Sequence, residues 1–225
     1  MDLKGECEMN NILRKELKLA ASPIAYFFIA FGLMFFLPGY PVLCGPFFVC
    51  LGIFKNFEYS REAGDITFSM LLPVSKRDIV WGKLAFTCII EAASLIVIAV
   101  ATVLRMSVFE DAEIYLSNAL MNANLFALGM ACLIFGLFNL IFVSGFFKTA
   151  YKTGKPFIWF IAICFLVITM AEAVHFIPGA EVMNAFGTEH FTIQLISLII
   201  LVAISIAMTY LAYRISARRF EKIDI

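Results

Sequence analysis

The sequence contains little charge for its length. Only 15% of its 225 residues are charged, while 62% are hydrophobic, and the mean hydropathy is +0.93. A typical soluble domain carries about 25% charged residues. Acidic and basic residues balance at 17 each, so there is no basic excess for a nucleic-acid partner. The scarcity of charge excludes an ordinary soluble domain and predicts an all-α membrane protein in contact with the lipid bilayer.

The chain also lacks the motifs of metal sites and nucleotide hydrolysis. Its six cysteines are scattered without C-x-x-C spacing, and its two histidines form no H-E-x-x-H motif. The only E-x-x-H spacing, Glu172 to His175, leaves an outward metal site in an intramembrane hydrolase as an alternative. The phosphate-binding G-x-x-x-x-G-K-[ST] motif is missing, because Gly154-Lys155 is followed by Pro156. We therefore expect no enzyme activity, no metal and no directly bound cofactor.

Long apolar runs dominate the rest of the chain. About 20 helical residues cross the hydrocarbon core of a bilayer, which is about 30 Å thick. We therefore predict one transmembrane domain over residues 1–225 with six spans and a cytoplasmic segment at 58–82. The first two spans fall within 22–57, and the other four are 84–104, 119–147, 157–174 and 191–213.

The positive residues predict the orientation. With six spans, both termini share one side, and of the 17 Lys and Arg residues only Arg105 falls on the other. This bias places both termini in the cytoplasm. The stretch before the first span, 9–21, has an apolar and a basic side, with Glu16 on the apolar side. It predicts an amphipathic helix along the inner membrane surface, or a simple basic anchor.

The polar stretch between the second and third spans predicts a short helix with two faces. Ile66 and Met70 share one face, while Phe68, Leu71 and Leu72 share the other. Apolar side chains exposed among charges usually mark a partner site. The alternative, which the spacing leaves equally open, is an ordinary loop whose apolar residues sit among the lipid headgroups.

The same stretch predicts how that short helix joins the third span. Pro73 ends the short helix, and Ser75 and Asp78 have the S-x-x-D spacing of a capping box. The next helix then continues without a break into the span at 84–104. A force on the short helix would therefore reach the third span directly.

The order of these parts resembles the membrane subunits of ABC-2 type transporters. The distinctive positions are an acid, a glycine, an apolar pair, a Pro-Val-Ser-Arg-like turn and a lysine: Glu62, Gly64, Leu71-Leu72, Pro73-Val74-Ser75, Arg77 and Lys83. Lys76 separates the serine from the arginine, a departure from the family pattern. The size is most similar to Pmt-type exporters of amphipathic peptide toxins, with bacteriocin self-protection permeases nearly as similar.

The resemblance implies a permease subunit in a bacterial cytoplasmic membrane. Its coupling helix would dock on a separate P-loop ATPase that holds ATP and Mg²⁺. A second permease copy would complete the path for an amphiphilic substrate. The residues expected to couple to the ATPase are Glu62, Asp65, Phe68, Met70, Leu71, Leu72, Pro73, Lys76 and Arg77.

Polar and aromatic residues inside the spans are the candidates for a substrate path. A charge near the bilayer centre costs about 2.5–3.5 kcal/mol, so Glu91 should face a path, another span or a hydrogen-bond partner. Asn139 on the fourth span could hydrogen-bond to another helix. The aromatic stripe of that span comprises Phe135, Phe138, Phe142 and Phe146. It could contact an apolar substrate, with Phe135, Phe138 and Phe142 as the candidates, or simply pack.

Two other kinds of protein remain as alternatives. A secondary transporter could use the intramembrane carboxylates Glu91 and Glu172, although no repeat in the sequence supports it. A scaffold without transport activity would need no substrate path. Glycines at 129 and 136, seven residues apart on the fourth span, would allow a neighbouring helix to approach closely in either case.

Overall fold

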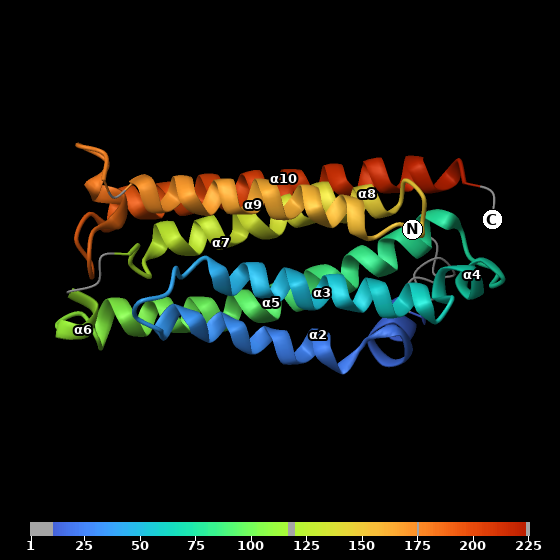
Figure 1. Ribbon diagram of the computed structural model, residues 1–225, viewed down its shortest axis with the longest axis horizontal. Helices are drawn as coiled ribbons and strands as arrows, with labels where there is room; N and C mark the ends of the chain where they lie inside the picture. Colours follow the sequence, from blue (N-terminus) through green and yellow to red (C-terminus); the bar gives the residue numbers. More distant parts are fainter. Residues whose placement is uncertain (1–10, 117–119, 175, 224–225) are drawn as a thin grey trace, which may run out of the picture.

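The protein is a bundle of long, nearly parallel and antiparallel helices (Figure 1). The computed structural model describes residues 11–116, 120–174 and 176–223, and these residues contain no strand. The first half of the chain forms one side of the bundle and the second half forms the other. The predicted all-α fold is confirmed.

Six stretches of the bundle correspond to the six apolar runs. An N-terminal helix, Asn11–Ala20, ends in a π-helical turn and meets the next segment at 90°. The elements that follow are α2 (Pro23–Phe27) with the 3-10 segment η2 (Phe28–Phe36), α3 (Cys44–Glu62), α4 (Asp65–Met70), α5 (Lys76–Ser107), α6 (Glu113–Leu116), α7 (Leu125–Phe138) with the π segment η3 (Asn139–Val143) and α8 (Ser144–Phe146), α9 (Gly154–Val174), the 3-10 segment η4 (Glu181–Asn184), and α10 (Phe191–Glu221).

Length and composition qualify four of these helices, within the described residues, as membrane spans. They are α5, α7 through α8, α9 and α10, and the bent pair Asn11–Ala20 and Pro23–Phe36 is a fifth candidate. The helix α3 has the length of a span, but its C-terminal part carries Lys55, Glu58, Arg61 and Glu62. Its apolar part is therefore short, and the count of six spans stays a prediction.

The helix ends follow local capping more closely than hydropathy. The third span was predicted at 84–104 within a helix that starts at the Ser75 cap, and α5 does begin at Lys76, directly after Ser75. The fourth was predicted from 119, but α7 begins at Leu125, where the side chain of Asn124 accepts a hydrogen bond from the amide of Ala127 at 2.9 Å. The last run was predicted at 191–213, but α10 continues to Glu221. Its final turns are polar but contain no helix-breaking proline or glycine.

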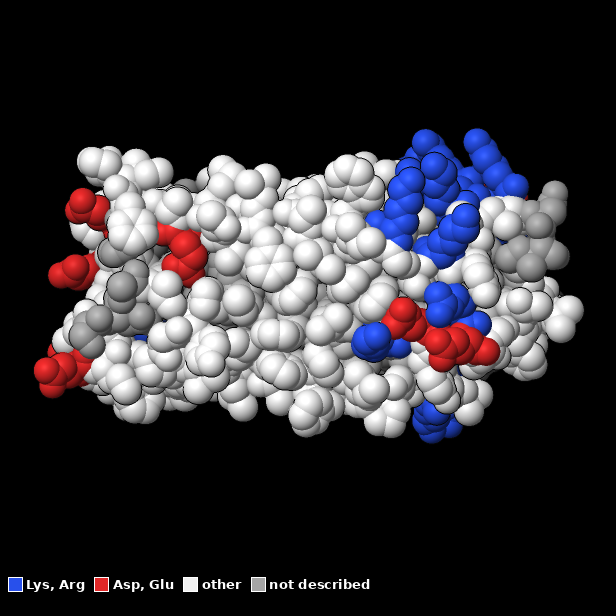
Figure 2. All heavy atoms as spheres, in the orientation of Figure 1, with Lys and Arg blue, Asp and Glu red and all other residues white. Residues whose placement is uncertain are grey.

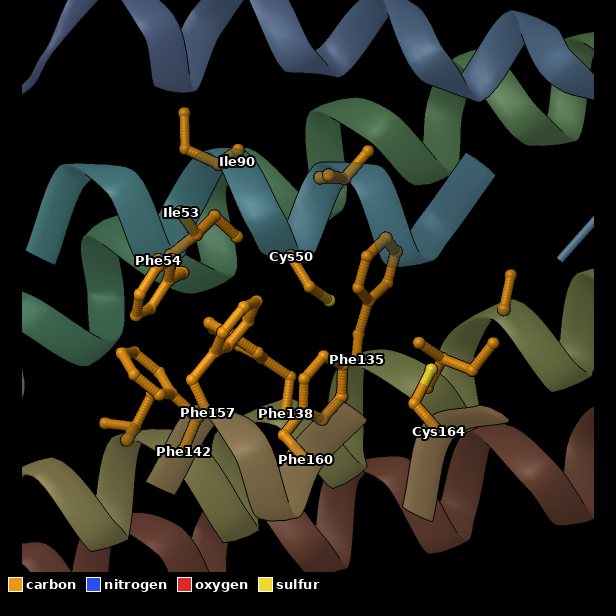
Figure 3. Packing of buried hydrophobic residues seen from close by; sticks show 14 of the residues in the cluster. Cys50, Ile53, Phe54, Ile90, Phe135, Phe138, Phe142, Phe157, Phe160 and Cys164 are labelled. Carbon is orange, nitrogen blue, oxygen red and sulfur yellow. The ribbon is translucent and has the colours of Figure 1, made fainter. Parts of the chain in front are cut away.

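The centre of the bundle is an aromatic core between α3, α7 and α9 (Figure 3). The ring of Phe54 stacks on that of Phe157 with centroids 3.8 Å apart, and both rings contact Phe142 edge-on. Phe138 contacts Phe142 and Phe160. Edge-to-face and stacked pairs of this kind add to the packing that already holds the helices together.

Glycines on α7 bring it unusually close to α10. A Cβ atom on Gly136 would lie 2.9 Å from the Cα of Ser205, and one on Gly129 would lie 3.2 Å from the Cα of Leu198. The hydroxyl of Ser205 donates to the carbonyl of Cys132 at 2.7 Å. The close approach expected at these two glycines is therefore present, and the neighbour is α10.

Charges are segregated along the long axis of the molecule. On the face shown in Figure 2, Lys and Arg gather toward one end, and the middle of that face shows no charged residues. The basic end contains α4 and the end of α10 (Figure 1). The N-terminal helix lies at this end too, because Lys15 pairs with Asp65 of α4. Both ends of the described chain thus lie on the same side of the apolar band.

Replacing Gly136 with alanine tests the contact between α7 and α10. The new methyl group would overlap Ser205, so we expect a loss of about 1–3 kcal/mol of stability, as for other overpacked sites. The measurement is the melting temperature of the purified protein in detergent. Gly154→Ala is the matched control, because no atom lies within 4 Å of the Cβ position at Gly154. Equal melting temperatures for the two variants would contradict the close packing.

Candidate coupling site

The short helix α4 presents an apolar pair to the outside of the molecule. Gly64, with φ of +65°, turns the chain after α3 in a conformation that suits glycine. Ile66 is buried against the bundle, whereas Phe68 is 57% exposed and Leu71 is 81% exposed. The predicted inner face is thus seen at Ile66, and the predicted outer face at Phe68 and at Leu71, which caps the C-terminal end of α4.

The other predicted residues of this surface lie around that apolar pair. Met70 and Leu72 are half-buried, and Pro73 is exposed beyond the end of α4. Glu62 is exposed at the end of α3, where it pairs with Arg61 at 3.4 Å. The predicted coupling surface is therefore a small apolar patch beside an exposed carboxylate.

The start of α5 forms the capping box expected from the sequence. The hydroxyl of Ser75 accepts a hydrogen bond from the amide of Asp78 at 3.2 Å, and the carboxylate of Asp78 accepts one from the amide of Ser75 at 3.1 Å. From this cap, α5 continues for 32 residues without a break, about 48 Å at the usual helical rise. The short loop after α4 thus leads into a single rigid rod.

Lys76 and Arg77, also expected on the coupling surface, join α5 to the last helix. The ammonium group of Lys76 donates to the carbonyl of Ile223 at 2.5 Å. The guanidinium of Arg77 pairs with the carboxylate of Glu221 at 2.5 Å and stays largely exposed. These two residues fasten the start of α5 to the end of α10. If they also contact a partner, they do so in addition to this structural role.

Beneath α4 lies a buried cluster of charges centred on Lys83. The ammonium group of Lys83 lies 2.8 Å from a carboxylate oxygen of Glu16 and 2.6 Å from one of Asp65. It also donates to the hydroxyl of Ser60 at 2.7 Å. The side chains of Lys83 and Glu16 are each only 1% exposed. One lysine on α5 thus binds the N-terminal helix, the end of α3 and α4.

Lys15 completes the cluster from the N-terminal helix. Its ammonium group lies 2.6 Å from Asp65 and 2.9 Å from Glu16, and it donates to the hydroxyl of Ser69 at 2.7 Å. Two lysines and two carboxylates therefore alternate around one point. We call Lys15, Glu16, Asp65 and Lys83 the charge cluster.

Electrostatics within the charge cluster favour the charged forms of Asp65 and Lys15. Burial alone would raise the pKa of Asp65, but the charge of Lys83 and the hydrogen bonds from both lysines outweigh burial and lower it. Burial alone would lower the pKa of Lys15, but the carboxylates of Glu16 and Asp65 raise it. Buried ion pairs of this kind fix a geometry even where they add little net stability.

Only indirect signs of the charge cluster were present in the sequence. Asp65 was expected to contact the ATPase, but its carboxylate points to the two lysines instead of outward. Glu16 was noted only as an acid on the apolar side of the predicted helix at 9–21, and Lys83 only through the family resemblance. An acid on an apolar helix face is the signal that could have revealed a buried cation. Residues 9 and 10 of the predicted helix lie outside the described residues.

A second polar group lies inside the bundle and joins three helices. The amide nitrogen of Asn139 donates to Glu91 of α5 at 2.9 Å and to Thr209 of α10 at 3.2 Å. Asn139 begins the π-helical segment η3, and such segments often occur at functional positions in helices. Glu91 thus has an inter-span partner, one of the roles expected for it.

The aromatic stripe expected to line a substrate path lies in the core. Phe135 is 2% exposed, and Phe138 and Phe142 are fully buried (Figure 3). The rings of Phe138 and Phe142 contact other phenylalanines of the bundle. This arrangement matches the packing alternative, and contact with a substrate would require the helices to separate. The substrate path itself stays a prediction.

The geometry offers no support for a metal site or for a transport role of the outer carboxylate Glu172. Among the described residues, no group of three or more His, Cys, Asp and Glu side chains could hold a metal ion. Glu172 accepts a hydrogen bond from the amide of Met121 at 2.8 Å, near the end of the bundle opposite α4. His175 lies outside the described residues.

Comparisons with known proteins agree with the arrangement of parts. A family model described as "ABC-2 family transporter protein" matches residues 11–221, nearly the whole chain. No curated protein and no solved structure matches the chain in the corresponding comparisons. The match covers the N-terminal helix, α4 and every long helix of the bundle.

Replacing Lys83 with methionine tests the charge cluster. The change leaves two buried carboxylates with only Lys15 between them, and breaking a buried pair costs about 3–5 kcal/mol. We expect faster hydrogen exchange of the α4 amides and of the N-terminal helix, measured by mass spectrometry. Lys55→Met, at an exposed pair with Glu58, is the control and should leave exchange unchanged. Unchanged exchange in Lys83→Met would show that the cluster does not hold α4.

Proposed function

The chain belongs to the ABC-2 transporter family, and we propose that it is the permease subunit of an ATP-driven exporter coupled through α4 to a separate ATPase. Membership of this family implies partnership with an ABC ATPase subunit. The sequence supplies no P-loop motif of its own. ATP and Mg²⁺ would therefore be held by the partner, and this chain would convert the partner's motion into movement of helices.

The observation that carries the proposal is the contrast between the two faces of α4. Its inner face is held by the buried charge cluster, while its outer face exposes Phe68 and Leu71. Two exposed apolar side chains at the end of a membrane protein, outside the apolar middle of the bundle, are suited to bind in a groove on a soluble partner. The firm attachment to α5 would pass the partner's displacement into the bundle.

The distribution of charge supports a cytoplasmic position for α4. Lys and Arg gather at the end that carries α4 (Figure 2), and positive residues are enriched on the cytoplasmic side of membranes. The ATPase, which needs ATP, would meet α4 on this side. In this orientation the acidic residues of α6 and of the loop after α9 face the outside of the cell. The membrane would be the bacterial cytoplasmic membrane, as the family resemblance implies.

A path for substrate would form between two copies of the chain. The interior of one copy is filled by the aromatic core, so a bulky molecule would not pass through it as it stands. A second permease copy would add the opposite wall. The size and layout shared with Pmt-type exporters point to amphipathic peptides as substrates, and movement of α5 would bring Glu91 and the aromatic stripe to that path.

Phe68→Asp and Leu71→Asp test the docking of α4. Each change places a charge where an apolar side chain would enter the partner, so we expect binding of the ATPase subunit to weaken by about thirtyfold or more. Binding is measured with the purified permease in nanodiscs, and membrane insertion should stay normal. Tyr151→Asp, at another exposed aromatic residue of the same end, is the control. Unchanged binding in both α4 variants would contradict the docking role.

Glu91→Gln tests the polar group inside the bundle. Glutamine keeps an oxygen that can accept from Asn139, so folding and ATPase assembly should be preserved. Loss of the ionisable group should lower substrate-stimulated ATP turnover in reconstituted vesicles. Ser94→Ala, one helical turn further along α5, serves as a control for a buried polar change. Turnover equal to that of the unmodified protein would reduce Glu91 to a packing role.

A further inference from the structure

A basic hollow lies on the outside of the bundle between α8 and α9. It has a volume of about 390 Å³, and none of the residues lining it is acidic. The loop after α8 lies at the α4 end of the molecule, because Arg61 donates to Thr153 of this loop at 3.2 Å. The lining residues are Ile141, Gly145, Lys148, Thr149, Lys152, Lys155, Pro156 and Trp159.

The rim of the hollow is built from two lysines on an ordered turn, Lys148 and Lys152, and from Lys155 at the start of α9. The hydroxyl of Thr149 accepts a hydrogen bond from the amide of Lys152 at 2.9 Å, which fixes the loop that carries Lys148 and Lys152. All three lysines are exposed. Within the described part of the chain, no carboxylate pairs with any of them. The rim therefore holds three positive charges that the protein does not neutralise.

The floor of the hollow is apolar and reaches toward the lipid-facing surface. Gly145 lets α8 approach α9 closely, since a Cβ there would lie 2.7 Å from the Cβ of Pro156. Trp159 is 60% exposed on α9, and Ile158 beside it is 66% exposed. Tryptophan is enriched at the depth where headgroups meet acyl chains. A ligand matching this surface needs both an anionic group and an apolar part.

We propose that this hollow binds the headgroup of an acidic phospholipid of the inner leaflet. The phosphate would lie among the three lysines, and the acyl chains would run along Ile141 and Trp159. Basic pockets between transmembrane helices are a recognised setting for acidic lipid headgroups. A soluble partner protein would reach the exposed lysines, but it would not reach the apolar floor, which faces the lipid. A phospholipid would contact both the lysines and the floor, so it fits the whole hollow better than a soluble protein does.

Tryptophan fluorescence tests this proposal directly. The chain has two tryptophans, so Trp81→Phe leaves Trp159 as the single reporter within the hollow. The protein is reconstituted in phosphatidylcholine vesicles that contain either brominated phosphatidylglycerol or brominated phosphatidylcholine. We expect phosphatidylglycerol to quench Trp159 at about tenfold lower mole fraction, because each lysine near an anionic headgroup contributes severalfold to affinity. Equal quenching by the two lipids would overturn the proposal.

A matched pair of triple variants separates the hollow from general attraction to anionic lipid. Changing Lys148, Lys152 and Lys155 to glutamine should abolish the preference for phosphatidylglycerol. Changing Arg14, Lys18 and Lys222 to glutamine removes three exposed charges from the same end, outside the lining of the hollow, and should preserve the preference. Equal loss of preference in both variants would show a diffuse charge effect and overturn a specific site.

Two competitors complete the test. Inorganic phosphate should not relieve the quenching, because it lacks the acyl chains that contact Trp159; relief by phosphate would make this a simple anion site. The ATPase subunit should also leave the quenching unchanged. Protection of Trp159 from both brominated lipids by the ATPase would identify the hollow as a protein contact and contradict the proposal.

Discussion

The structure depends on a single buried lysine. Lys83 neutralises Glu16 and Asp65 in a place where none of the three would be tolerated alone. Because these residues come from the N-terminal helix, α4 and α5, their pairing ties three separate segments into one unit. Because of this attachment, a force applied to the apolar pair on the outer face of α4 would be passed on to the bundle. Without it, α4 would be a short helix on a loop, free to move without moving the bundle.

Local features of the fold could be predicted from the sequence, because their causes lie within a few residues of one another. The two faces of α4, the Ser75–Asp78 cap and the continuous run into α5 all follow from helical spacing and capping. The charge cluster could not be predicted in the same way, since Glu16, Asp65 and Lys83 are far apart in the chain. Only an acid on an apolar helix face hinted at a buried partner.

Hydropathy alone also had limits inside the membrane. It could locate the long helices but not decide whether α3, with charges over its last turns, crosses the bilayer. It identified Glu91 as a costly residue and Asn139 as a possible hydrogen-bonding residue, but only the fold shows that they hydrogen-bond to each other. The phenylalanine stripe has the same spacing whether it packs or contacts substrate. Its burial follows from α3 and α9, which the periodicity of α7 could not reveal.

The most direct test of the account is photocrosslinking from position 71 in the assembled transporter. A photoreactive phenylalanine derivative replaces Leu71, the most exposed apolar residue of the α4 region, in membranes that also contain the ATPase subunit. The account predicts a crosslinked product of permease and ATPase, and no such product from the same probe at Leu116 of α6. Crosslinks from position 71 to lipid alone, in a complex that still hydrolyses ATP, would contradict it.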